Sequence, residues 1–437
     1  MSSHNVEVHK FGGACFRTTS SFQLVLKILQ NIEPPMIIVP SAFYGVTDSL
    51  HSLLKSTSAS QISNEIADLK TFHLQILGGS ASQNSLGQID QLFIDLEKLI
   101  KGMVLTGETS SRMRDYVLSF GERLSSYILM LALKNLSPFL LDPVNVLRTN
   151  GVYYEASVQH EESKELVIQN LLPLLEKKKP IIIPGYYGGD KDGNVTLLGR
   201  SGTDYSAASI ANLVEAKSLT IWKEVPAFMT ADPKLIPNAK PLSFLDYDST
   251  ELLTHFGAKL IHPKALTPLR TKKIPLYVRN LYDPTNYTLI SSSSDEQSIL
   301  PVISIKKDLV LATIFFSSAK TASEFRKQLL KEFTNDGLPT YGLLLIGGKV
   351  IVAFERSHQT HFNNVAKMFP YLDLVYRDAA AIFAYGSSPS EFHDLEWFHD
   401  LWSIPLPDKR SFLIFISPER SLELGRSIHD HLLQANI

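Results

Sequence analysis

Residues 6–13 read VEVHKFGG, and this stretch decides the expected fold. Its first part is typical of a short buried strand. Two glycines then lead into Ser21–Asn31, where apolar residues recur at helical spacing. A second apolar strand, Met36–Val39, follows. Because strand, glycine turn, helix and strand form the repeating unit of parallel sheets, an α/β fold with a mainly parallel sheet is predicted.

The composition is that of an ordinary globular protein. The 437 residues suffice for two or three domains of roughly 100–200 residues each. With 44% hydrophobic residues the chain can bury a sizeable core, and a net charge of −2 gives no electrostatic reason to expect nucleic acid or a membrane as partner. A single cysteine excludes an intrachain disulfide. Without a targeting segment or an apolar run of about 20 residues, a soluble cytoplasmic protein is expected.

The order of predicted elements divides the chain into a body and a tail. Ile181–Pro184 is predicted to be a buried strand before a glycine-rich loop, and Leu276–Val278 the last strand of the body. The polar stretch 291–300 is the predicted linker. Residues 1–290 would form one domain. Residues 301–437, in which strands and helices follow the order of two βαββαβ units, would form a separate α+β region.

Lys10 and the glycine pair Gly12-Gly13 are candidates for binding a phosphate. Adjacent glycines let backbone N–H groups approach an anion, and the helix that follows adds positive potential at its N-terminus. A lysine beside them supplies a point charge for a phosphoryl group. A plain turn with a surface lysine explains the same residues, so the pattern alone leaves both interpretations open.

A second candidate site lies between residues 198 and 206, which read LGRSGTDYS. Arg200 is suited to bidentate recognition of a carboxylate. Ser201, Thr203 and Asp204 are residue types that cap helices, so a capped helix after a flexible loop is the alternative. The density of glycine, hydroxyl and charged residues between two apolar segments favours a ligand site.

Glu122 and two further loops complete the candidates. Glu122 lies on the first turn of a predicted helix, where it could bind an amino group or simply complement the helix dipole. Lys223 and Glu224 follow a predicted strand, and Lys259 lies two residues after Gly257. Ligands of open α/β sheets bind outside the carboxyl ends of the strands, where such loops converge.

An ordered set of short motifs resembles the aspartate kinases of the amino-acid-kinase superfamily. The set covers about residues 6–290, and its strength lies in the order of many motifs. The motifs are KFGG from Lys10, SAFYGVTD from Ser41, FGER from Phe120, PGYYGG from Pro184, LGRSGTDYSAA from Leu198, WKEV from Trp222, TADP from Thr230 and FGAKLIHPKAL from Phe256.

The resemblance implies a fold and a reaction. The fold would be a three-layer amino-acid-kinase domain followed by tandem ACT-like domains, which are ferredoxin-like βαββαβ units. The reaction would be that of an ATP:L-aspartate 4-phosphotransferase. It transfers the γ-phosphoryl of ATP to the side-chain carboxylate of L-aspartate and gives 4-phosphoaspartate, the first step towards lysine, diaminopimelate, threonine and methionine. ATP and Mg²⁺ are implied, with Mg²⁺ held mostly by ATP oxygens.

The resemblance also assigns roles to residues that match the family's motifs. Lys10 and Asp204 would be catalytic, with Lys10 neutralising the transferred phosphoryl and Asp204 orienting the lysines. Arg200 would bind the substrate α-carboxylate, and Glu122 its ammonium. The aspartate pocket would further contain Thr47, Tyr186 and Thr203. The nucleotide would be bound by Lys10, Gly12, Gly13, Ser41, Lys223, Glu224, Met229, Lys234 and Lys259.

The chain departs from the family pattern at five places. The departures are Ala14-Cys15 for Thr-Ser, Phe120 for His, Ser201 with Thr203 for Gly with Ser, Lys223-Glu224 for Thr-Asp, and Met229 for Tyr. The tail lacks the glycine that begins the first ACT helix, so the sensed amino acid is left open. By resemblance a homodimer through the tail is expected. A non-catalytic amino-acid-binding regulatory subunit, and a kinase for a different carboxylate, are the alternatives.

Overall fold

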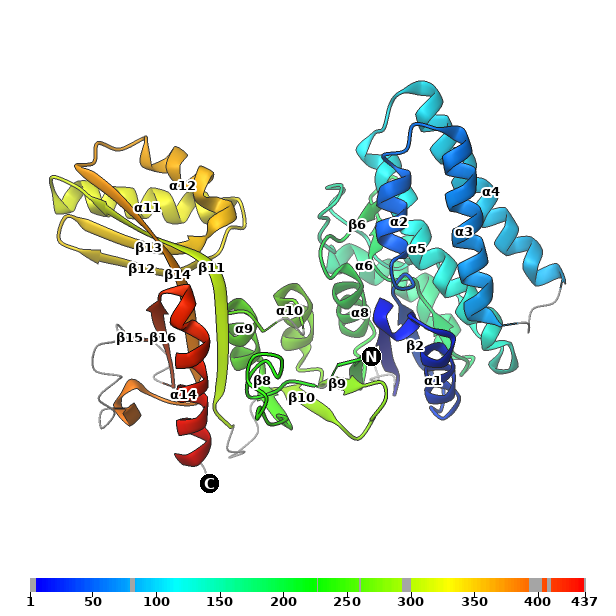
Figure 1. The fold of residues 1–437 in the computed structure, drawn as a ribbon. Coiled ribbons are helices and arrows are strands. Elements are labelled where there is room, and N and C mark those ends of the chain that lie inside the picture. Colours follow the sequence, from blue (N-terminus) through cyan, green and yellow to red (C-terminus); the bar gives the residue numbers. More distant parts are fainter. Residues whose placement is uncertain are drawn as a thin grey trace. The chain divides into compact units, whose positions relative to one another are not determined.

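The computed structural model describes residues 5–78, 83–225, 227–258, 261–292, 300–392, 403–406 and 410–435. The chain forms two compact units. The first comprises Met1–Phe228, Ser243–Tyr247 and Leu260–Asp295, and the second comprises Met229–Leu242, Asp248–Lys259 and Glu296–Ile437. Figure 1 labels the elements of both units. Among the described residues, no helix combines the length and the apolar character needed to cross a membrane.

An eight-stranded sheet forms the centre of the first unit. Its order is β3-β4-β2-β1-β7-β9-β10-β8, and every neighbouring pair is parallel except β9 with β10. The strands are β1 (Glu7–Phe11), β2 (Met36–Pro40), β3 (Phe139–Leu140), β4 (Ile181–Ile182), β7 (Ser218–Lys223), β8 (Phe244–Asp246), β9 (Leu276–Asn280) and β10 (Tyr287–Ser291). The most central strands, β1, β2 and β7, are almost wholly buried, as expected of a parallel sheet covered on both faces.

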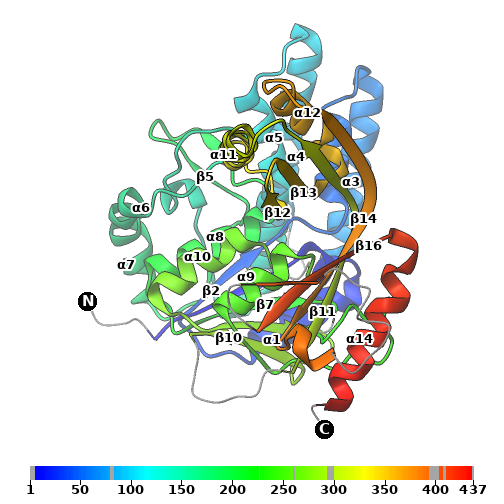
Figure 2. The same cartoon turned by 90° about the vertical axis from the view of Figure 1, so that its left-hand side faces the viewer.

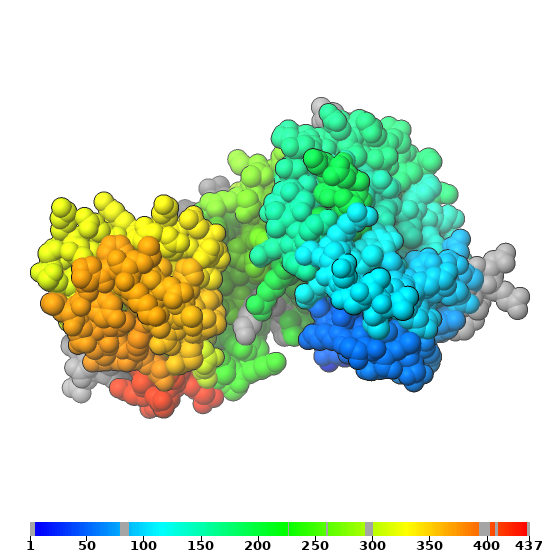
Figure 3. Space-filling view, turned by 90° about the horizontal axis from the view of Figure 1, so that it is seen from above, coloured from blue at the N-terminus to red at the C-terminus, as the bar shows by residue number. Residues whose placement is uncertain are grey.

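Helices cover this sheet and extend from it. They are α1 (Thr19–Gln30), α2 (Val46–Leu53), α3 (Ala59–Leu77), α4 (Gln83–Thr106), α5 (Ser111–Ala132), α6 (His160–Leu166), α7 (Leu172–Leu175), α8 (Gly202–Leu213) and α10 (Pro263–Lys272). Helix α1 begins with a capping box between Thr18 and Ser21, which explains its abrupt start. Helices α3 and α4, blue to cyan, form an exposed face of this unit (Figure 3). The hairpin of β5 (Tyr187–Gly189) and β6 (Val195–Leu197) precedes α8.

The second unit contains a six-stranded antiparallel sheet in the order β12-β13-β11-β14-β16-β15. Its elements, besides α9 (Tyr247–His255), are β11 (Val302–Phe315), α11 (Ala319–Asn335), β12 (Thr340–Ile346), β13 (Lys349–Glu355), α12 (Gln359–Ala366), β14 (Asp373–Tyr385), β15 (Ser403–Pro405), β16 (Ser411–Ile416) and α14 (Ser421–Ala435). Figure 2 shows α14, in red, alongside β16 and β11.

Two hydrophobic cores lie along the same sheet. Phe325, Phe354 and Phe362 belong to the core beneath α11 and α12, while Phe412 and Ile428 belong to the core beneath α14. The long strands β11 and β14 contribute residues to both cores. The two parts of the tail, one around each hydrophobic core, are therefore joined through the shared strands β11 and β14.

Strand β14 is continuous from Asp373 to Tyr385, so no break between strands separates the two βαββαβ units that the element order predicts for the tail. This strand pairs with β11 along almost its whole length, with one irregularity between Lys306 and Leu309, so the exposed residues in its middle do not end it.

Candidate active site

Lys10, Asp204 and Lys223 form a cluster at the carboxyl edge of the parallel sheet. Strands β1 and β7 are neighbours, and both end at this edge. Asp204 lies in the first turn of α8. Its Oδ1 is 2.6 Å from Lys10 Nζ, and its Oδ2 is 3.5 Å from Lys223 Nζ. Lys10 and Asp204 are only 5% and 4% exposed. One buried carboxylate thus holds two ammonium groups.

The electrostatics of this cluster favour an anionic ligand. Burial disfavours the charged form of Asp204, but the two lysines more than compensate and hold its pKa below the usual value. Burial lowers the pKa of Lys223, and the neighbouring charge of Lys10 acts in the same direction, while Asp204 opposes both. With both lysines protonated the cluster has a net charge of +1, which suits a phosphoryl group.

Of the glycine pair, Gly13 leaves no room for a side chain, whereas Gly12 would tolerate a Cβ. A Cβ on Gly13 would lie 2.8 Å from the carbonyl oxygen of Ala42, and one on Gly12 would lie 3.6 Å from Lys10 Nζ. The short helix Gly13–Phe16 follows. Cys15 within it donates a hydrogen bond to the carbonyl oxygen of Trp222 at 3.3 Å, and burial raises the pKa of its thiol to about 11. Cys15 is therefore a buried filler rather than a nucleophile.

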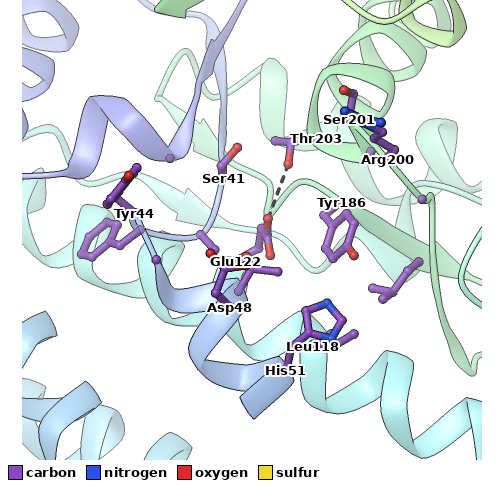
Figure 4. A pocket seen from close by; sticks show the side chains of 18 of the residues that line it. Ser41, Tyr44, Asp48, His51, Leu118, Glu122, Tyr186, Arg200, Ser201 and Thr203 are labelled. Atoms are coloured by element: carbon purple, nitrogen blue, oxygen red, sulfur yellow. Dashed lines mark hydrogen bonds between the residues drawn. The ribbon is translucent and has the colours of Figure 1, made fainter. Parts of the chain in front are cut away.

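A cavity of about 660 Å³ lies beside this cluster, within the first unit (Figure 4). Its walls come from the loop after β2, from α2 and α5, and from the loops on either side of the β5–β6 hairpin. Seven predicted site residues line it, namely Gly13, Ser41, Thr47, Glu122, Tyr186, Arg200 and Thr203. The structure therefore brings the residues predicted to bind aspartate into one cavity.

Glu122 is the buried acidic group of the cavity. It is 3% exposed, and Thr203 Oγ1 donates a hydrogen bond to its Oε1 at 3.4 Å. Its Oε2 is buried and has no partner among the described residues. Burial raises the pKa of Glu122 to about 8, although the backbone N–H of Ala42 and the charge of Lys10 oppose this rise. An unpartnered carboxyl oxygen of this kind is suited to receive a cationic hydrogen-bond donor.

Two residues in left-handed conformation shape the opposite wall. Tyr186 has φ +76° and Ser201 has φ +57°. The backbone N–H of Tyr186 donates to Ser206 Oγ at 3.0 Å, which ties this loop to α8. A Cβ on Gly185 would lie 2.2 Å from Thr203 Cγ2, so only glycine fits there. Arg200 is exposed, and no carboxylate among the described residues is within ion-pair distance of it.

The predicted nucleotide residues are divided between the two units. Lys223 belongs to the lysine cluster. Glu224 forms an ion pair with Arg17 at 3.5 Å and accepts a hydrogen bond from Tyr282 at 2.9 Å. Met229 and Lys234 belong to the second unit, where Lys234 follows a turn held by Asp232. Lys259 lies outside the described residues.

Sequence reasoning missed several residues of the cavity wall. They are Tyr44, Asp48, His51, Arg114 and Tyr154. The prediction that Glu122 lies on the first turn of a helix is wrong, because α5 begins at Ser111. Only with this earlier start does helical spacing place Arg114, eight residues before Glu122, on the same face as Leu118 and Glu122, and all three line the cavity. Tyr154 could not have been found from helical spacing, because it lies in a loop beyond the end of α5.

Comparison with known proteins identifies the family. The model of the amino acid kinase family matches residues 5–280. A bifunctional aspartokinase/homoserine dehydrogenase of Buchnera aphidicola is 30% identical over 284 residues, covering 62% of this chain and 34% of the relative. Lysine-sensitive aspartokinase 3 of Escherichia coli is 25% identical over 317 residues, covering 71% of this chain and 69% of the relative. The chain spans about a third of the length of the bifunctional relatives.

The fold is also found among solved structures. The crystal structure of Escherichia coli aspartokinase III in complex with aspartate and ADP matches with a TM-score of 0.83 and 21% identity, covering 98% of this chain and 100% of the other. This likeness, together with the parallel sheet and the antiparallel tail sheet, confirms the predicted fold class. Since the family model covers more than half of the residues, the chain belongs to the amino acid kinase family.

Proposed function

We propose that this protein is an aspartate kinase, which transfers the γ-phosphoryl of ATP to the side-chain carboxylate of L-aspartate. The observation that carries this proposal is a cavity with an unpartnered buried carboxyl on Glu122, next to two lysines held by one aspartate. The first group suits the ammonium of an amino acid, and the lysines suit a transferred phosphoryl. The relatives named above as aspartokinases support the choice of substrate.

In this proposal the acceptor needs no general base. Its side-chain carboxylate is ionised at pH 7 and is itself the nucleophile. Glu122 would bind the ammonium and Arg200 the α-carboxylate, with Thr47, Tyr186 and Thr203 forming the walls. Catalysis would then consist of positioning and of charge stabilisation on the moving phosphoryl. Lys10 would supply that charge, and Asp204 would orient Lys10.

The donor would be ATP, bound outside the carboxyl ends of the strands. Gly12, Gly13 and Ser41 are proposed to lie against its phosphates. Lys223, Glu224, Met229, Lys234 and Lys259 are the other proposed nucleotide residues. A Mg²⁺ ion is proposed to arrive bound to ATP oxygens, where it would neutralise phosphate charge.

The roles of the two parts of the chain remain proposals as well. Residues 1–290 would carry the reaction, residues 291–300 would connect, and residues 301–437 would be the ACT-like region that regulates the enzyme and forms a homodimer. The antiparallel sheet with its two cores supports this reading of the tail. The same family relationship supports the proposal that the protein is cytoplasmic and serves the synthesis of lysine, diaminopimelate, threonine and methionine.

A hydroxamate assay tests the proposed reaction. ATP, aspartate and hydroxylamine should give aspartyl hydroxamate, because an acyl phosphate is trapped as it forms. Lys10→Ala and Asp204→Ala should abolish the product while the circular dichroism spectrum is kept. Lys217→Ala is the matched control, since Lys217 pairs with Glu7 at the far end of β1 and is exposed. Normal turnover by Lys10→Ala would refute the role of Lys10.

A panel of other amino acids with a side-chain carboxylate decides which acceptor is used. Binding of an amino acid without turnover would favour the alternative of a non-catalytic regulatory subunit.

A further inference from the structure

One face of α5 forms a continuous wall of the cavity. Arg114, Leu118 and Glu122 all line it, at spacings of four residues. At 1.5 Å per residue, the Cα atoms of Arg114 and Glu122 are about 12 Å apart along the helix. Side chains on a helix lean towards its N-terminus, so Glu122 and Arg114 lean in the same direction. The same wall thus presents a carboxyl and a guanidinium at its two ends.

Arg114 has free hydrogen-bonding capacity. Its Nε is buried and has no partner among the described residues, and none of their carboxylates lies within ion-pair distance of its guanidinium. The positive charge of Arg114 acts on two other wall residues. Burial lowers the pKa of His51, and the charge of Arg114 lowers it further. Burial raises the pKa of Tyr186, and the charge of Arg114 opposes that rise. The charge is therefore directed at the cavity.

The ring of Tyr154 lies against this guanidinium. The Cζ of Arg114 lies 4.8 Å from the centre of the Tyr154 ring. Tyr154 has φ +70°, and its backbone N–H donates to Asp115 Oδ2 at 3.0 Å. Asp115 is fully buried and also accepts from the backbone N–H of Leu197 at 2.9 Å, so it ties two parts of the wall to α5. The guanidinium lies over the Tyr154 ring as in a cation–π contact, which leaves its N–H groups available for an anion.

We propose that Arg114 is a second carboxylate-binding residue of the acceptor cavity and recognises the α-carboxylate of the amino acid whose ammonium is bound by Glu122. This inference rests on the proposed function. Arg200, which the family resemblance assigns to that carboxylate, lies on an exposed loop between Gly199 and Ser201, both in left-handed conformation. The preorganised guanidinium of Arg114 would share the carboxylate with Arg200.

The test compares two acceptors in the hydroxamate assay. L-Aspartate carries the α-carboxylate, and L-aspartic acid α-amide keeps the ammonium and the reactive side chain but lacks that charge. Arg114→Ala should raise the KM for aspartate about 10- to 100-fold, as expected for a hydrogen bond to a charged group, with kcat and the KM for ATP nearly unchanged. The α-amide should be used poorly by the wild type and no worse by Arg114→Ala.

Two further variants separate recognition from structure. Arg112→Ala is the control, because Arg112 is exposed on the same helix and is absent from the cavity wall. It should behave as the wild type. Arg114→Lys keeps the positive charge but lacks the paired N–H donors of the planar guanidinium, so it should give an intermediate KM for aspartate. If Arg114→Ala is unstable, the lysine variant alone decides, since an unchanged KM for aspartate would overturn the inference.

The outcomes distinguish this inference from the proposed function. An equal rise in KM for aspartate and for the α-amide would show that Arg114 merely shapes the cavity, and it would overturn the inference while the kinase activity stands. A wild type that forms no hydroxamate from aspartate would count against the proposed function itself. In that case calorimetry of aspartate binding to the wild type and Arg114→Ala would still decide the role of Arg114.

Discussion

Glu122→Gln replaces the buried carboxyl of the cavity by a neutral group of the same shape, and two pH-dependent effects should follow. In the wild type, burial raises the pKa of Glu122 to about 8, so the group is mostly protonated at pH 7. Binding of an ammonium requires its ionised form. The KM for aspartate should therefore fall as the pH rises towards 8 and level off above it.

The size of the change in KM follows from the raised pKa of Glu122. At pH 7, one unit below that pKa, ionising Glu122 costs about 1.4 kcal/mol, which corresponds to about a tenfold weaker apparent affinity than above pH 8. Glu122→Gln cannot ionise, so its KM should be high and should vary little between pH 6 and pH 8. Loss of a charge-assisted hydrogen bond adds about 1.5–3 kcal/mol, or roughly 10- to 150-fold in KM.

Ionisation of Glu122 should favour binding of aspartate but should lower the stability of the fold as the pH rises. A carboxyl whose folded-state pKa is raised from its ordinary 4.5 to about 8 destabilises the fold as the pH rises through that window. The cost is absent below pH 4.5 and reaches an upper bound of about 5 kcal/mol above pH 8. Glu122→Gln removes this cost, so it should raise the Tm by several degrees at pH 8 and leave it nearly unchanged at pH 4.5.

The assay is hydroxamate formation against aspartate concentration from pH 6 to pH 8.5, with thermal melts in the same buffers. Thr47→Val is a useful control, because it alters another wall residue without removing a titrating group. The reasoning is refuted if the KM of the wild type is flat across this range, or if Glu122→Gln keeps the wild-type slope. A variant that melts lower at pH 8 than the wild type would likewise contradict the assigned burial cost.

Two further predictions concern packing and reactivity in the first unit. Gly185→Ala should destabilise the protein by about 1–3 kcal/mol and reduce turnover, because its Cβ would lie 2.2 Å from Thr203 Cγ2. Gly102→Ala, with open space at the same atom in α4, should melt at or above the wild-type temperature, and equal destabilisation by both would contradict the packing argument. Cys15 should resist iodoacetamide at pH 8 in the folded protein, because burial raises its pKa to about 11. Intact-mass spectrometry checks this, with denatured protein as the positive control, and alkylation at the rate of a free thiol would disprove it.

Local patterns predicted much of the architecture. The apolar strands at Val6–Val8 and Met36–Val39, and the glycine pair between them, are recognisable because backbone propensity and periodicity act over a few residues. The order of motifs likewise indicated residues that line one cavity, among them Thr47, Glu122 and Tyr186. Pairing over long distances was harder to predict. The middle of β14 is exposed and charged, so only its pairing with β11 shows that it is one strand.

The sequence by itself determined the succession of elements, the glycine turns and the chemical types available for the site. Tertiary structure decided which of them meet. Lys10 and Lys223 share Asp204 only because β1 and β7, more than 200 residues apart in the chain, are neighbours in the sheet. Arg114 is backed by Tyr154 only because buried Asp115 binds that loop to α5. Such contacts depend on the packing of distant segments, and the pKa of Glu122 depends on the burial that this packing creates.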